Sequence, residues 1–261
     1  MDSGIDGSGS TRRNFFKKIG QSVLVVPAIS SSGVLALVES TATAQSRKAT
    51  QPVANAKPAL TLNVRDYGAV GDGTIKDTAA LQQAIDRCWV FGGGEVVVPA
   101  GNYLTGAIAL RSNVLLRLEK DAVIAGSPDF ADYPVMQVRW EGKWIPGHVG
   151  LIYAVQADHT GIVGPGKIMG NYALGGRPNA KNPLRHPALI EPMGCNHLRF
   201  EDFSTDYHLM WSLHPTYCED IVIRNLTIRS TGGNGDGIDV DSCKRCLSTD
   251  ATFLRVMTVF R

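Results

Sequence analysis

The feature that most constrains the fold is a repeat marked by cysteines. The segment that begins at Cys195 aligns with segments that begin at Cys218 and Cys243, at spacings of 23 and 25 residues. A looser copy begins at Ala157, and its apolar run includes Ile162. A period in the low twenties, with short strands and no helix, is typical of stacked coils that bury a continuous core. The repeat therefore predicts an all-β fold, a parallel β-helix.

The rest of the chain after residue 60 agrees with this fold. Short apolar runs bounded by Gly, Asn, Asp and Pro read as strands, and they lie at 114–116, 151–153, 161–163, 188–190 and 221–223. The leucine-rich repeat has a similar period, but its L-x-x-L-x-L-x-x-N pattern is absent.

One amphipathic helix is expected from Thr78 to about Phe91, with Asp77 as its N-cap. One face of this helix is apolar and contains Leu81, Ala84, Ile85, Cys88 and Trp89. Because an open β-helix end exposes core and strand edges, we expect the helix to cap the N-terminal end of the coils.

Residues 1–44 have the features of an export leader. Arg12-Arg13 precede an aromatic pair and two lysines, which resembles a twin-arginine signal, and Ala42-Thr43-Ala44 supplies a cleavage pattern. The apolar stretch between them is too short for a membrane span. We expect a bacterial, periplasmic or secreted protein with a linker at 45–60, a folded domain at 61–261 and no stable membrane association after cleavage.

Composition narrows the classes of partner. A net charge of +2 offers no basic surface for nucleic acid, although a few local cations suffice for an acidic polysaccharide. Cys243 and Cys246 form a C-x-x-C pair, which suits a redox or metal site or two small residues in a strand or turn. The second interpretation is favoured because no other C-x-x-C is present. We expect a monomer with no cofactor and no metal.

Three aspartates form the densest polar cluster. In a strand, Asp239 and Asp241 would point to one face and Ile238 and Val240 to the other, with Asp236 at the strand entry. Close carboxylates suit acid–base chemistry, Ca²⁺ binding or a simple Asx-rich turn. The cluster alone leaves all three open.

A family resemblance bears on this choice. Asn234-Gly235-Asp236-Gly237-Ile238-Asp239, followed by Asp241-Ser242-Cys243, resembles the N-T-D-G-x-D…D-S-C signature of the polygalacturonases, glycoside hydrolase family 28. The stretch 211–218 resembles the W-x-x-H-P-x-x-C segment of that family, and the match runs from about residue 61 to about 245. The resemblance implies a right-handed parallel β-helix that hydrolyses α-1,4 bonds between galacturonates of pectin with inversion.

The resemblance also implies roles for single residues. It implies that Asp236 orients or activates the attacking water and that Asn234, Asp239 and His214 bind substrate. For His214 two interpretations stay open, a hydrogen bond to a sugar or a catalytic aspartate and a structural histidine before Pro215.

The match fails after Arg245. The Asp-Asp pair, the Gly-His-Gly segment and the Arg-x-Lys segment of the family are absent, and Gly235 replaces the family threonine. We therefore expect a β-helix truncated at its C-terminal end by a frameshift or misassembled gene, with little activity. The alternatives are a Ca²⁺-dependent pectate lyase-like β-helix and a non-catalytic carbohydrate-binding β-helix.

Overall fold

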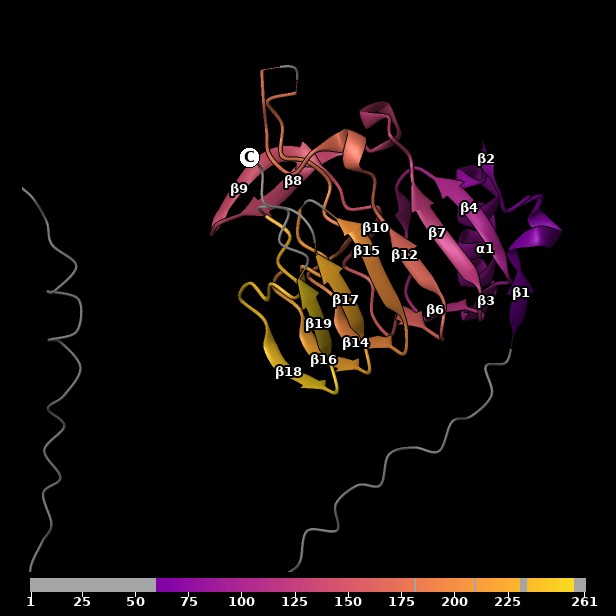
Figure 1. Ribbon diagram of the computed structural model, residues 1–261. Helices are drawn as coiled ribbons and strands as arrows, with labels where there is room; N and C mark the ends of the chain where they lie inside the picture. Colours follow the sequence, from indigo (N-terminus) through magenta and orange to yellow (C-terminus); the bar gives the residue numbers. More distant parts are fainter. Residues whose placement is uncertain (1–59, 181, 209, 231–233, 256–261) are drawn as a thin grey trace, which may run out of the picture. The chain divides into compact units, whose positions relative to one another are not determined.

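Two long parallel sheets carry the repeat in the computed structural model, which describes residues 60–180, 182–208, 210–230 and 234–255. The first sheet has the order β1-β3-β6-β11-β14-β16-β18, formed by Thr61–Asn63, Gly94–Val98, Val114–Leu118, Gly161–Val163, Asn196–Glu201, Glu219–Arg224 and Lys244–Thr249. The second has the order β2-β4-β7-β12-β15-β17-β19, formed by Asp72–Lys76, Gly101–Thr105, Ala122–Gly126, Lys167–Met169, Ser204–His208, Thr227–Ser230 and Thr252–Arg255. Successive strands alternate between the sheets, as Figure 1 shows.

A shorter third sheet closes each coil. It contains β5 (Ile108–Ala109), β10 (Ile152–Val155) and β13 (Ile190–Met193). Parallel bridges from Ile190 to Leu213 and from Leu213 to Ile238 continue the same column. All ladders among these three sheets are parallel, so the predicted parallel β-helix is confirmed.

The cysteine repeat corresponds to a physical stack inside the coils. The main-chain N–H of Cys195 lies 3.4 Å from the Sγ of Cys218, and the N–H of Cys218 lies 3.3 Å from the Sγ of Cys243. The N–H of Ala157 makes the same contact, 3.4 Å long, with the Sγ of Cys195. Each thiol therefore occupies the same corner of its own coil, which explains why the cysteines mark the period. All five cysteines are free thiols.

Each coil also turns at fixed left-handed positions. Tyr217, Asp220 and Asn225 have φ of 51°, 55° and 51°, and the residues one coil away are left-handed as well. Those equivalents are Gly194, His197 and Asp202 on one side and Ser242, Arg245 and Asp250 on the other. Because an L-residue with φ above zero is uncommon, this recurrence shows that the corners of the coil, and not local propensity, set the backbone there.

Helix α1 (Thr78–Val90) packs against the N-terminal strands, where the sequence predicts it (Figure 1). The prediction is wrong at two residues. Asp77 makes no side-chain cap, because its carboxylate accepts the N–H groups of Val70 and Gly71 at 2.6 and 3.0 Å and so fixes the preceding turn. Trp89 is 49% exposed rather than part of the buried face.

An antiparallel hairpin departs from the coil pattern. Strand β8 (Val135–Trp140) pairs with β9 (Lys143–His148), and a bridge from Gly147 to Arg185 ties the hairpin to the segment before the third sheet. Three short 3-10 turns complete the described elements: η2 (Val64–Tyr67), η3 (Phe130–Asp132) and η4 (Tyr172–Leu174).

The expected leader and most of the expected linker lie outside the described residues. Leu60, the last residue of that linker, already belongs to the fold, because its carbonyl accepts the N–H of Glu95 at 2.9 Å. Within the described ranges, no helix has both the length and the apolar character needed to cross a membrane.

Candidate active site

The candidate site lies on the outer side of the third sheet column. Four apolar residues stack in register from coil to coil, and they are Ile152, Ile190, Leu213 and Ile238. The first three are buried and Ile238 packs against the core. The residues that follow them alternate to the opposite face, and from coil to coil these are Tyr153, Glu191, His214 and Asp239.

Main-chain bonds to the preceding coil hold the three aspartates in place. The carbonyl of Asp236 accepts the N–H of Ser212 at 2.9 Å, and the N–H groups of Asp239 and Asp241 donate to the carbonyls of Leu213 and Pro215 at 2.9 and 3.0 Å. Asp236 is exposed, and the side chain of Asp239 is 41% exposed. The stack therefore presents the carboxylates of Asp236 and Asp239 to the outside, and we call the surface formed by Asp236, Asp239 and Asp241 the aspartate wall.

One detail of the predicted strand is wrong. Ile238 and Asp241 form only isolated bridges, and Val240 is 43% exposed instead of facing the interior with Ile238. The alternation ends at Asp239 because no continuous strand pairing extends beyond it in the described coil.

The surroundings of two of the aspartates move their pKa values in opposite directions. Burial, followed by repulsion from Asp236 and Asp241, raises the pKa of Asp239. Burial also acts to raise the pKa of Asp241, but hydrogen bonds from Ser242 and Arg139 outweigh it, so that this pKa is lowered. The Ser242 Oγ and Arg139 Nε atoms lie 2.7 and 2.9 Å from the carboxylate of Asp241. Neighbouring carboxyl groups with pKa values moved apart are suited to acid–base chemistry.

Asn234 is placed beside a cation. Its side-chain oxygen accepts the Nε–H of Arg177 at 2.9 Å, and its amide nitrogen donates to the carbonyl of Gly176 at 3.2 Å. Arg177 is exposed, and among the described residues no carboxylate lies within ion-pair distance of it. Among the described residues, Arg177 therefore carries a positive charge that no carboxylate pairs, next to Asn234. The sequence prediction missed Arg177, which lies 57 residues from Asn234.

His214 lies beneath Asp239 and does not reach the surface. It is 1% exposed, and its ring packs against Trp211 with the ring centroids 4.1 Å apart. Its Nδ1 lies 2.8 Å from the carbonyl oxygen of Asp239 and 3.4 Å from the Oδ2 atom. Because a carbonyl only accepts, Nδ1 carries the proton, and Nε2 accepts from the Thr216 hydroxyl at 3.3 Å. Because the ring is buried and its Nδ1 bonds a main-chain carbonyl, this geometry fits the structural interpretation of His214 and not the expected contact with a sugar.

The burial of His214 predicts a pH dependence of stability. Burial lowers the pKa of this histidine from 6.5 to about 4. The unfolded chain therefore binds the proton more readily, and the stability falls as the pH drops from about 6.5 to about 4. At pH 4 the loss amounts to about 3 kcal/mol.

Urea unfolding of the wild-type chain and of His214→Asn between pH 4 and 7 measures this effect. The wild-type free energy of unfolding is expected to fall more steeply with acid than that of the variant. His197→Asn, in which the replaced side chain is 52% exposed, is the control and should keep the wild-type slope. Parallel pH curves for the wild type and His214→Asn would contradict the assignment.

A buried ion pair lies one coil below His214. The guanidinium of Arg185 bonds the Glu191 carboxylate through Nη2, and neither side chain is exposed. The second oxygen of Glu191 accepts the N–H of Gly150 at 2.9 Å, and Arg185 lies over the Trp211 ring, 5.8 Å from its centroid. Arg185 and Trp211 therefore pack one on the other, and Trp211 in turn packs against His214.

The C-x-x-C pair makes no metal centre in the described part of the chain. Cys243 belongs to the interior thiol stack, whereas Cys246 pairs in register with Ile221 on the first sheet. No group of three or more His, Cys, Asp or Glu side chains could hold a metal ion among the residues that the structure describes.

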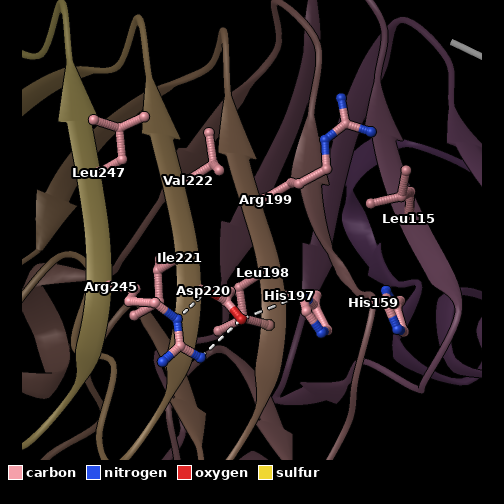
Figure 2. Close-up of a pocket in the computed structure, with 10 residues that line it drawn as sticks. All are labelled: Leu115, His159, His197, Leu198, Arg199, Asp220, Ile221, Val222, Arg245 and Leu247. Atoms are coloured by element: carbon pink, nitrogen blue, oxygen red, sulfur yellow. Dashed lines mark hydrogen bonds and ion pairs between the residues drawn. The ribbon is translucent and has the colours of Figure 1, made fainter. Parts of the chain in front are cut away.

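A hollow of about 660 Å³ lies elsewhere, on the first sheet (Figure 2). Its lining includes the stacked rings of His159 and His197, 4.4 Å apart, and the ion pair of Asp220 with Arg245. None of the four predicted site residues lines it. Because its cations are largely paired with carboxylates and no catalytic pair lies in it, we place the chemistry at the aspartate wall.

The chain has relatives among known proteins. The family described as rhamnogalacturonase A/epimerase, pectate lyase-like, matches residues 61–135. A probable polygalacturonase of Vitis vinifera is 31% identical over 191 residues, which cover 68% of this chain and 39% of that protein. An exo-poly-alpha-D-galacturonosidase of Dickeya chrysanthemi is 47% identical over 73 residues, or 28% of this chain and 12% of that protein.

A solved structure extends the likeness to the fold. The crystal structure of a hyperthermoactive exopolygalacturonase from Thermotoga maritima superposes with a TM-score of 0.67 at 27% identity, over 76% of this chain and 53% of that chain. The chain thus spans less than half the length of the two curated relatives and about half of this structure.

Proposed function

Because this chain is a parallel β-helix of the pectin lyase-like superfamily with polygalacturonase homologues, we propose that it belongs to a pectin-degrading glycoside hydrolase. The proposed reaction is hydrolysis of α-1,4-galacturonosidic bonds with inversion. The observation that carries the proposal is the aspartate wall, where Asp236 and Asp239 lie close enough to repel each other and Asn234 of the same segment holds Arg177. The proposal includes an extracellular polysaccharide as the substrate and the export leader expected for residues 1–44.

Each site residue has a proposed role. An inverting glycosidase needs one carboxylate to activate a water and one carboxylic acid to protonate the leaving oxygen. We assign the water to Asp236, which is exposed, and the binding of the sugar to Asn234 and Asp239. His214 is a positioning residue, since it holds the main chain of Asp239 from below.

The reaction also needs a second carboxyl group that acts as the general acid with Asp236. The 261 residues contain no two adjacent aspartates, which the family resemblance implies as the other carboxylates of the reaction. Loss of a general acid costs roughly 10²–10⁴-fold in rate. We therefore expect hydrolysis of polygalacturonate by the purified chain to be slower by about that factor than hydrolysis by the Thermotoga maritima exopolygalacturonase.

Release of reducing ends from polygalacturonate, measured for both proteins, tests the rate. Proton NMR of the first products tests the stereochemistry, because inversion of an α-bond yields the β-anomer. Retained α-anomers would contradict the inverting mechanism. Ca²⁺-dependent products that absorb in the ultraviolet would indicate a lyase, and tight binding without any cleavage would indicate a carbohydrate-binding protein.

The role of Arg177 predicts opposite effects of two substitutions on binding. Arg177→Ala removes charge-assisted hydrogen bonds to a galacturonate carboxylate and should weaken trigalacturonate binding at least about tenfold. Asp236→Asn removes a like charge and should tighten it about fivefold. Calorimetric titration at low salt measures both affinities.

Arg87→Ala is the matched control, because Arg87 is an exposed arginine on α1, away from the aspartate wall. It should leave the affinity unchanged, and high salt should reduce the effects of both site variants. Equal losses for Arg87→Ala and Arg177→Ala would show that only net charge matters and would refute the assigned contact.

A further inference from the structure

Two exposed aromatic rings lie beside the aspartate wall and have no role in the proposed chemistry. Trp144 on β9 and Tyr217 at a coil corner are each 47% exposed. Their ring centroids are 6.0 Å apart and their planes are within 16° of parallel. Large, half-exposed aromatic side chains that gather in one place on a surface mark a binding site more often than scattered single ones do.

One arginine, Arg139, contacts both rings and holds them in place. The guanidinium carbon of Arg139 lies over both rings, 5.5 Å from the Trp144 centroid and 5.1 Å from the Tyr217 centroid. Its Nε bonds the carboxylate of Asp241 at 2.9 Å, and the arginine side chain is only 11% exposed. The rings are therefore held in a fixed arrangement by a buried ion pair, so that little side-chain entropy remains to be lost when a ligand binds.

The main chain of Tyr217 ties its ring to the aspartates. Its φ of 51° is that of the coil corner, which Gly194 and Ser242 share in the neighbouring coils with φ of 63° and 57°. The N–H of Tyr217 donates to the carbonyl of Asp241 at 2.9 Å, and this bond keeps the ring next to the aspartate wall.

We propose that Trp144 and Tyr217 form a sugar-stacking subsite that binds a second pyranose ring of the acidic polysaccharide beyond the ring bound at Asp236 and Asp239. The apolar C–H face of a pyranose fits a flat aromatic surface, and the half of each ring that is exposed is available to it. The proposal rests on the proposed function, because it takes the same chain of galacturonates as its ligand.

The chain-length dependence of binding tests this subsite. Titrations with di-, tri-, tetra- and hexagalacturonate should show a rise in affinity once the oligomer is long enough to reach the rings. In Trp144→Ala and Tyr217→Ala the rise should be lost, with about tenfold weaker binding of the longest oligomer and unchanged binding of the dimer. Trp144→Phe should keep most of the rise.

Trp89→Ala is the matched control, because Trp89 is 49% exposed on α1 and has Arg111 over its ring at 5.7 Å. It should not change the affinity for any oligomer. Losses in Trp144→Ala that are equal for all lengths, or no loss at all, would overturn the subsite while leaving the proposed function intact. A wild-type chain that binds none of the oligomers would overturn both.

Discussion

Replacing Glu191 by Gln is expected to lower the free energy of unfolding by about 3–5 kcal/mol, because it leaves the charge of Arg185 buried without a partner. Neither side chain of this pair is exposed, so water cannot replace the lost carboxylate. The single oxygen of glutamine can still accept the N–H of Gly150, and its NH2 group then faces Arg185, so the substitution removes both the charge and the hydrogen bond that Arg185 donates. Urea unfolding followed by circular dichroism measures the change.

The chain offers a matched control in a more exposed pair. Arg117 bonds Glu95, with 2.8 Å between Arg117 Nε and Glu95 Oε2, and the arginine side chain is 42% exposed. Glu95→Gln should therefore cost only about 1 kcal/mol or less. Adding Arg185→Met to Glu191→Gln should recover part of the stability, since no unpaired charge remains. Equal costs for Glu191→Gln and Glu95→Gln would mean that the buried pair contributes no more than a surface pair.

The second large effect is expected at Gly161, where two coils pack too closely for a side chain. This glycine has φ of 155°, and a Cβ built on it would lie 1.9 Å from the carbonyl oxygen of Arg199 on the next strand. Gly161→Ala therefore forces the two coils apart in addition to straining the backbone, at a cost of about 4 kcal/mol. The midpoint of urea unfolding measures the loss.

Gly142→Ala separates the two contributions to that cost. Gly142 has φ of 79° at the turn of the hairpin, and a Cβ there would meet nothing within 4 Å. Its replacement should cost about 1 kcal/mol, the price of the backbone conformation alone. If Gly161→Ala were as mild as Gly142→Ala, the close stacking of these coils would be wrong.

The coils could be predicted from the sequence because the same kind of interior residue recurs once in each coil. The thiols of Cys195, Cys218 and Cys243 occupy one corner of successive coils. The number of residues between two of these cysteines is therefore the length of one coil. The resemblance pointed to Asn234 and Asp236 in the same way, since one short segment carries both residues. A motif within one short segment can be found from the sequence alone, without knowledge of the three-dimensional contacts.

The contacts that complete the site could not be predicted in this way. Arg139 reaches Asp241 across 102 residues, and Arg177 reaches Asn234 across 57. Both arginines come from insertions between the strands of the coil, where no period constrains the sequence. The same reason explains why the hairpin of β8 and β9 was missed and why Asp77, a plausible helix cap by pattern, binds a neighbouring turn instead.

A crystal structure of the chain with a bound galacturonate oligosaccharide tests the central claim most directly. We predict a sugar ring over Asp236 and Asp239 with its carboxylate on Arg177, and a neighbouring ring against Trp144 and Tyr217. An oligosaccharide bound only in the hollow of the first sheet, or an Asp236 side chain turned into the core of the coils, would contradict the account.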